Sequence, residues 1–324
     1  MKFTSILSIF AVVSLFASCS NDLEINAPYK DIPVVHAFLD QNEPVQYIRI
    51  QKVYQNGTGS TTLEGAQITD SLYFDSLIVD LIEARTGTVY PCKRIDTVYK
   101  DSGLFSNAVH HLYVTSFPKN ENAEEQFNLR IHVPRSGNTF YNKEPINLVK
   151  DAFVEDRTIS VDTVFNHSFP YRFRTGRNAT LYDLSIRFYY TETEKANPSN
   201  VQEKVFEYFI QRAKVYTYSA SIKAEAVLSK NFISNLQANI KFNNLVNRKY
   251  SRIEFVAYGG SKEYQEYLEL SKPNTSIVPK NSEYSNITGG KGIFSSRNKI
   301  VQTQMKLDSK SIGILTAILP NFVN

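Results

Sequence analysis

The residues that could carry out chemistry are few and scattered along the chain. The five histidines are His36, His110, His111, His132 and His167, and none belongs to the His-Glu-x-x-His pattern that holds zinc on a helix. The adjacent pair would point to opposite faces of a strand and could not chelate one ion. The chain has no Cys-x-x-Cys pair and no Gly-x-Ser-x-Gly nucleophile elbow. The sequence therefore predicts no metal, no cofactor and no enzymatic activity.

One enzymatic alternative is left open by this pattern. Ser/His/Asp triads and the carboxylate pairs of glycoside hydrolases are recognised by geometry in the folded chain, and sequence spacing does not reveal them. The alternative is a surface hydrolase with a convergent active site. It requires a cleft in which a histidine lies within hydrogen-bond reach of an aspartate or glutamate. The chain has no tryptophan, whose indole commonly stacks on sugars in catalytic clefts.

A glycine-rich stretch near the C-terminus is the most distinctive motif. Residues 286–294 read Asn-Ile-Thr-Gly-Gly-Lys-Gly-Ile-Phe, and such a density of glycine indicates positive φ angles or a close approach of the backbone. A phosphate-binding P-loop needs a hydroxyl residue after its lysine and an earlier glycine, but Gly292 and Ser285 stand at those positions. The stretch is interpreted either as a tight turn that leads into the core or as a partner-binding loop. The candidate residues of such a loop are Asn286, Gly289, Gly290, Lys291 and Gly292.

The N-terminus indicates where the protein works. Residues 1–18 combine a basic start, a short apolar stretch and a small-residue exit, which is typical of a secretory signal. The stretch is shorter than the roughly 20 apolar residues of a spanning helix. The run Leu-Phe-Ala-Ser-Cys at residues 15–19 resembles the lipobox of bacterial lipoproteins. This resemblance implies that Cys19 becomes the first residue and carries a diacylglycerol on its sulfur, which anchors the protein to a membrane.

Composition limits the rest of the chain. Its formal net charge of +4 over 324 residues is too small a surplus to predict a nucleic-acid partner. Hydrophobic residues make up 42% and charged residues 21%, which is ordinary for a folded chain, and the length predicts two domains. Besides Cys19 the chain has one cysteine, Cys92, so no internal disulfide is expected. We interpret Cys92 as a partly buried small residue; the alternative is a thiolate favoured by neighbouring cations.

Hydrophobic periodicity predicts a mainly β fold. After the signal (1–18) and a lipidated tether (19–30), residues 31–148 show about seven short alternating runs separated by turn residues. This pattern predicts an N-terminal antiparallel β-sandwich, immunoglobulin-like, with its clearest strand at residues 127–133. Residues 149–324 are expected to form a mixed α+β domain with a largely antiparallel sheet, and this domain would carry the glycine-rich stretch.

The second half also contains the predicted helices. Ser229 and Ser261 are candidate N-caps of two helices, and a third is expected from Asp308 to about Leu319. Residues 201–218 fit either a helix or a strand. Aromatic and β-branched residues dominate after Phe206, which favours a strand.

Several of these segments together resemble one bacterial family. The glycine-rich stretch, Gly259-Gly260 with the tyrosine-rich helix after it, and residues 272–275 are similar to the lipoprotein family catalogued as domain of unknown function 4249. Residues 33–39 and 46–50 resemble the start of that family's N-terminal part. The resemblance covers essentially the whole mature chain. It implies an outer-membrane lipoprotein whose gene commonly lies beside a TonB-dependent transporter, and it implies no reaction.

These observations lead to an expectation for the function. We expect a lipid-anchored binding or accessory protein of the outer membrane that assists a TonB-dependent transporter. Acidic residues soon after the lipid cysteine, Asp22 and Glu24, resemble an export signal, which favours the cell surface over the periplasmic face. Besides the hydrolase, a structural or adhesive surface module stays open as an alternative. Such a module predicts an exposed apolar patch larger than a few hundred Å² and no concave pocket.

Overall fold

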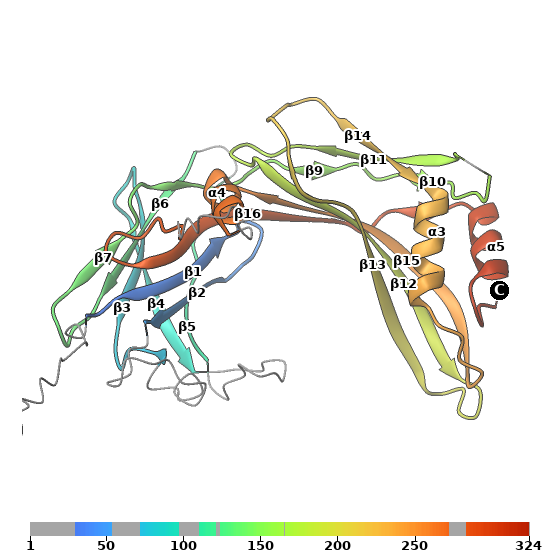
Figure 1. Ribbon diagram of the computed structural model, residues 1–324, viewed down its shortest axis with the longest axis horizontal. Helices are drawn as coiled ribbons and strands as arrows, with labels where there is room; N and C mark the ends of the chain where they lie inside the picture. The colour runs from blue at the N-terminus through green and yellow to red at the C-terminus, as the bar shows by residue number, and fades with distance from the viewer. Residues whose placement is uncertain are drawn as a thin grey trace, which may run out of the picture.

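The protein is mainly β, as the periodicity predicts. The computed structural model describes residues 30–53, 72–96, 110–120, 124–164, 166–271 and 283–323. The described strands form a twelve-stranded sheet, a three-stranded sheet and a two-stranded sheet, and most pairs in the large sheet are antiparallel. Two lobes are joined by one long strand into an arch (Figure 1).

The elements divide between the two lobes and their junction. The first lobe contains β1 (Pro33–Leu39), β2 (Gln46–Lys52), β3 (Ile78–Glu83), β4 (Val89–Asp96), β5 (His111–Thr115), β6 (Gln126–His132), β7 (Thr139–Tyr141) and β8 (Ile146–Asn147). The second lobe contains β9 (Phe153–Val154), β10 (Thr158–Ile159), β11 (Ser168–Arg174), β12 (Leu181–Glu194), β13 (Val201–Val215), β14 (Lys223–Leu228), α3 (Ser229–Asn239), β15 (Val246–Gly260), β17 (Lys306–Leu307) and α5 (Ser309–Ile318). At the junction lie α4 (Lys262–Leu270) and β16 (Lys291–Gln302).

Strand β16 connects the two lobes. Its first half pairs in parallel with β1, beginning with Lys291 opposite Val34. Its second half pairs antiparallel with β15, beginning with Arg297 opposite Gly260. The large sheet therefore runs without interruption in the order β13-β12-β15-β16-β1-β2-β5-β4-β3-β6-β7, with β8 beside β6.

The first lobe is a curved sheet folded around its own core. Alternate residues of β1, namely Val35, Ala37 and Leu39, are buried and pack with side chains of β3 and β6. Strand β4 changes partner along its length, because its first half pairs with β3 and its second half with β5. The predicted sandwich has two separate sheets, whereas in the structure β4 joins the two layers into one continuous sheet.

The glycine-rich stretch belongs to this first core, although we expected it in the second domain. Ile287 and Phe294 are buried among the core residues of the first lobe. The physical reason is that β1 has a second edge whose backbone groups need partners, and β16 supplies them. Pairing across such a distance in the chain leaves no periodic signal, so the boundary at residue 148 misplaces this segment.

The second lobe has an aromatic core. Helices α3 and α5 and the β14-β11-β9 sheet cover one face of the long strands β12, β13 and β15 (Figure 1). Tyr171 stacks on Phe255 with ring centroids 4.6 Å apart, and Phe188 meets Phe232 of α3 nearly edge-on. A fully buried ring of this kind stabilises the fold by roughly 1.5–3 kcal/mol. Residues 201–215 form β13 along the free edge of β12, so the strand expected there is confirmed.

The helix starts agree with expectation at two of three positions. Ser261 and Asp308 are the N-caps of α4 and α5, but Leu228 is the N-cap of α3 and Ser229 is its first residue. The hydroxyl of Ser229 is fully buried and contacts His167 Nδ1 at 2.8 Å, so it ties the helix to the chain before β11 instead of capping it. Among the described residues no helix is long and apolar enough to cross a membrane.

The Asp308 cap generates a pH-dependent prediction. Its Oδ1 accepts a hydrogen bond from the Ser311 backbone N–H at 2.7 Å, and hydrogen bonding by Ser311 holds the pKa of Asp308 below its ordinary 3.8. A lowered carboxyl pKa stabilises the fold above the unfolded pKa, and this stabilisation is lost as pH falls through the folded pKa. Asp308→Ala should lower the free energy of unfolding by about 1 kcal/mol at pH 7, measured by urea denaturation.

Asp308→Asn is the matched control for this prediction. Asparagine caps helices as well as aspartate does but does not titrate, so this variant should stay close to wild type at pH 7. The gap between wild type and the alanine variant should shrink at pH 3. An equal gap at both pH values would contradict the role assigned to the carboxylate.

Candidate ligand-binding groove along the first strand

The outer face of β1 forms the floor of a groove. Because side chains alternate along a strand, Val34, His36 and Phe38 point away from the core and are half-buried. Three cavities of about 240, 360 and 270 Å³ follow these residues in order. His36 lines the first two cavities and Phe38 lines the last two, so the cavities adjoin one another. We call this concave surface the β1 groove.

Helix α4 forms one wall of the β1 groove. Tyr264 and Tyr267, three residues apart on one helix face, line the third and first cavities respectively. The ring of Tyr264 packs edge-on against Phe38, with centroids 5.2 Å apart. A Cβ on Gly260 would lie only 2.5 Å from the Tyr264 ring, which explains why glycine precedes this helix. The double glycine of the sequence thus lets an aromatic ring close the wall.

The third cavity is completed by polar groups of three neighbouring strands. Glu207 accepts a hydrogen bond from Ser185 Oγ at 2.6 Å and pairs with Arg187, whose Nε lies 3.3 Å from Oε1. Arg187 also donates to the Tyr258 hydroxyl at 2.8 Å. Burial would lower the pKa of Arg187, but Glu207 and Tyr258 outweigh this effect and raise it. The guanidinium therefore stays charged, and this cross-strand network fixes the end of the groove.

Arg297 is the cation available to a ligand in the β1 groove. It lies where β16 passes from β1 to β15, and it lines both the second and the third cavity. Its side chain is exposed, and its positive charge acts on Asp40, which lines the second cavity together with Glu43. Aromatic rings of Phe38, Tyr258 and Tyr264 line the same cavity. An anionic or hydrogen-bond-accepting group could therefore bind at Arg297 while an apolar part contacts the rings.

The floor of the groove also holds polar atoms without partners. His36 lies opposite Arg49 on β2. Within the described residues, His36 Nδ1 and Arg49 Nε are buried and have no hydrogen-bond partner. Burial, together with the Arg49 charge, lowers the pKa of His36, so its imidazole is neutral at pH 7. Buried polar atoms are normally paired, and a bound ligand is one way of pairing them.

The glycine-rich stretch closes one end of the β1 groove. The Asn286 side chain pairs with both backbone groups of Phe294, donating at 2.6 Å and accepting at 2.9 Å. Gly292 has φ +91°, and a Cβ there would lie 2.1 Å from the Val35 carbonyl oxygen. Gly289 also has a positive φ, of +68°. These contacts favour the interpretation of the stretch as a tight turn.

The other residues of this stretch leave a partner-binding role as a prediction. Gly290 lies against β1, since a Cβ there would be 2.9 Å from the Pro33 carbonyl oxygen. Lys291 Nζ forms an ion pair with Glu283 at 2.6 Å. Glu283 and Gly292 line the first cavity of the groove. Cys19, the predicted lipidation site, lies outside the described residues.

One histidine lies within hydrogen-bond reach of an acidic residue, which is part of what the hydrolase alternative requires. His111 Nδ1 lies 2.8 Å from Asp96 Oδ1, but Arg94 contacts both partners, its Nε lying 2.7 Å from that oxygen. Hydrogen bonding by Arg94, with smaller contributions from the Arg94 charge and from His111, holds the pKa of Asp96 below its ordinary value. The three residues form an ion-pair cluster in which the carboxylate and the imidazole are already engaged.

The remaining candidate chemistry is absent or inert in the described part of the chain. No group of three or more His, Cys, Asp or Glu side chains there could hold a metal ion. Burial raises the pKa of Cys92 to about 12, so its thiol stays protonated at neutral pH, in agreement with a structural role. Sequence patterns did not point to Phe38 or Arg297, because nothing local distinguishes them from other strand residues.

Gly292 provides a test of the turn. Gly292→Ala should lower the free energy of unfolding by about 3 kcal/mol, because a non-glycine residue at positive φ is strained and the added methyl overlaps β1. Gly313→Ala is the control, since a Cβ there meets nothing within 4 Å and α5 should gain up to about 1 kcal/mol. Urea denaturation measures both. Equal midpoints for Gly292→Ala and wild type would contradict the close approach to β1.

Comparisons with other proteins supply no relative. The chain matches no model of a known protein family, no curated protein and no solved structure. The resemblance to the lipoprotein family, and the anchor and partner that it implies, therefore stay predictions.

Proposed function

We propose that the protein is a lipid-anchored binding or accessory protein of the cell envelope and that the β1 groove is its binding surface. The observation that supports this most directly is the continuity of three cavities along one strand where the two lobes join. Ligand sites commonly lie at such junctions, with mostly apolar and aromatic walls and a few convergent polar groups. The third cavity has aromatic walls of this kind, whereas charged side chains, among them Asp40, Glu43 and Arg297, gather around the second.

The shape of the groove favours an elongated partner. From Val34 to Phe38 the floor extends over four residue steps, or about 13 Å at the rise of a strand. An extended loop of another protein has matching dimensions and could offer hydrogen-bond acceptors to Arg297. In our proposal the partner is a TonB-dependent outer-membrane transporter, which is what the resemblance of the sequence implies. A purely adhesive module would not need a concave surface of this kind.

The anchor is the first part of the proposal to test. Mass spectrometry of the mature protein from its native membrane should find Cys19 as the first residue, carrying a diacylglycerol. The protein should enter the detergent phase of a phase separation, and Cys19→Ala should move to the aqueous phase because it lacks the acyl chains. An uncut Met1 without modification, or wild-type protein entirely in the aqueous phase, would refute lipid anchoring.

The partner is tested by capture with the anchored protein. Affinity capture from solubilised membranes should recover a TonB-dependent β-barrel, identified by mass spectrometry. Arg297→Glu should reduce the recovered barrel at least about tenfold, because it replaces the cation that faces the partner's acceptors with a carboxylate. Lys249→Glu makes the same charge change at an exposed position of β15 outside the groove and should leave capture unchanged.

Two outcomes would count against this assignment. Repeated capture without a β-barrel would exclude the transporter as a stable partner. Equal losses in the two variants would show that net charge, and not the β1 groove, governs the interaction.

A further inference from the structure

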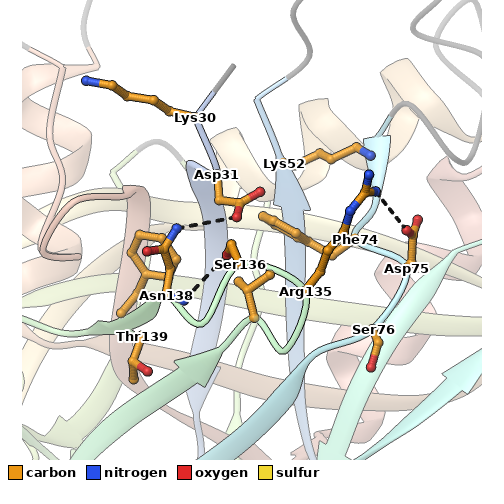
Figure 2. A pocket seen from close by; sticks show the side chains of 12 residues that line it. Lys30, Asp31, Lys52, Phe74, Asp75, Ser76, Arg135, Ser136, Asn138 and Thr139 are labelled. Carbon is orange, nitrogen blue, oxygen red and sulfur yellow. Dashed lines mark hydrogen bonds and ion pairs between the residues drawn. The ribbon is translucent and has the colours of Figure 1, made fainter. Parts of the chain in front are cut away.

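A larger cavity lies at the end of the first lobe that is remote from the second lobe. It has a volume of about 630 Å³ and is formed by the start of β1, the end of β2, residues 74–76 and the turn between β6 and β7. Figure 2 shows the polar side chains that surround it. None of the residues that line the β1 groove lines this cavity, so the two sites are separate.

Positive charge is in excess in this cavity. Lys30, Lys52 and Arg135 line it together with two carboxylates, Asp31 and Asp75. Asp75 pairs with Arg135 at 3.4 Å, and Asp31 accepts a hydrogen bond from the side chain of Asn138 at 3.4 Å. The amino groups of Lys30 and Lys52 form no hydrogen bond or ion pair with the described residues. Among the described residues, the cavity thus carries three cations against two anions, and Lys30 and Lys52 have no acidic partner there.

The arrangement of the cations suits an anionic ligand. In Figure 2 the charged ends of Lys52 and Arg135 are directed toward one another. Both side chains line the cavity, so an anion bound there would be attracted by two positive charges. The lining also includes Ser76 and Ser136, whose hydroxyls can donate further hydrogen bonds. Proteins recognise phosphate by placing several hydrogen-bond donors and cations around its oxygens.

We propose that this cavity binds the phosphate of an anionic lipid headgroup and so docks the end of the first lobe on the membrane that holds the anchor. Lys30, which lines the cavity, follows the predicted lipid cysteine by 30 − 19 = 11 residues. A chain of that length spans at most about 40 Å, so headgroups of the same leaflet lie within reach. The assignment of the phosphate to a membrane lipid rests on the proposed function. The binding of a phosphate as such rests on the cavity alone.

The test separates the cavity from the anchor. The mature chain, residues 19–324, carries Cys19→Ser so that no lipid can be attached, and its binding to vesicles is measured by flotation. The vesicles consist of phosphatidylcholine, with or without about one third phosphatidylglycerol. We expect binding only to the anionic vesicles. Each cation near such a surface strengthens binding about fivefold, so the double variant Lys52→Gln/Arg135→Gln should weaken it about 25-fold.

Lys241→Gln/Lys249→Gln is the matched control, since it removes two exposed cations of the second lobe. It should change binding less than about twofold. Arg135 has a side chain 88% exposed, so its substitution should leave the melting temperature unchanged. An equal loss in the two double variants, or no binding to anionic vesicles by the unsubstituted chain, would overturn the proposal.

Inorganic phosphate distinguishes the two sources of the ligand. At constant ionic strength, added phosphate should displace the chain from anionic vesicles more strongly than chloride does. If phosphate raises the melting temperature of the chain but not of Lys52→Gln/Arg135→Gln, and no vesicles are bound, the ligand is a free phosphate and the headgroup assignment is wrong. Because Cys19 is replaced throughout, an absence of lipidation in the native protein would leave these results unaffected.

Discussion

The parallel pairing of β16 with β1 is the constraint on which the structure depends. It satisfies the backbone groups on the second edge of β1, and it requires Gly292 to lie against the Val35 carbonyl group. The Asn286 side chain reinforces the contact by bonding both backbone groups of Phe294. The same strand then continues into the second lobe as the partner of β15. One strand therefore completes the sheet of one lobe and attaches it to the other.

This constraint also builds the β1 groove. With both edges of β1 paired and its inner face in the core, the outer face is what remains for a ligand. The passage of β16 between the lobes places Arg297 beside Phe38, and α4 follows directly after β15 to place Tyr264 over the same ring. Side chains from distant parts of the chain converge because the strand order brings them together.

Local features were predictable from the sequence, whereas the convergence of distant segments was not. The mainly β fold, strand β13 and the helix starts at Ser261 and Asp308 follow from local patterns, which act over a few residues, although only the Asp308 side chain makes a capping hydrogen bond. Ser229 was misassigned because its hydroxyl bonds a distant histidine. Alternation along β1 indicates that the His36 side chain points to the opposite face from Val35 and Ala37. It does not indicate which face α4 packs against. The place of the glycine-rich stretch depends on pairing that no local pattern records.

The distance in the chain between β1 and its parallel partner has a consequence for folding. Val34 pairs with Lys291, a separation of 291 − 34 = 257 residues. During synthesis from the N-terminus, that edge of β1 has no partner until residues 291–296 have been made. Contacts between residues so far apart in the sequence form slowly, and an unpaired strand edge can pair with a wrong strand in the meantime. The first lobe therefore cannot complete its sheet before β16 has been made. A product truncated before β16 lacks the partner of β1.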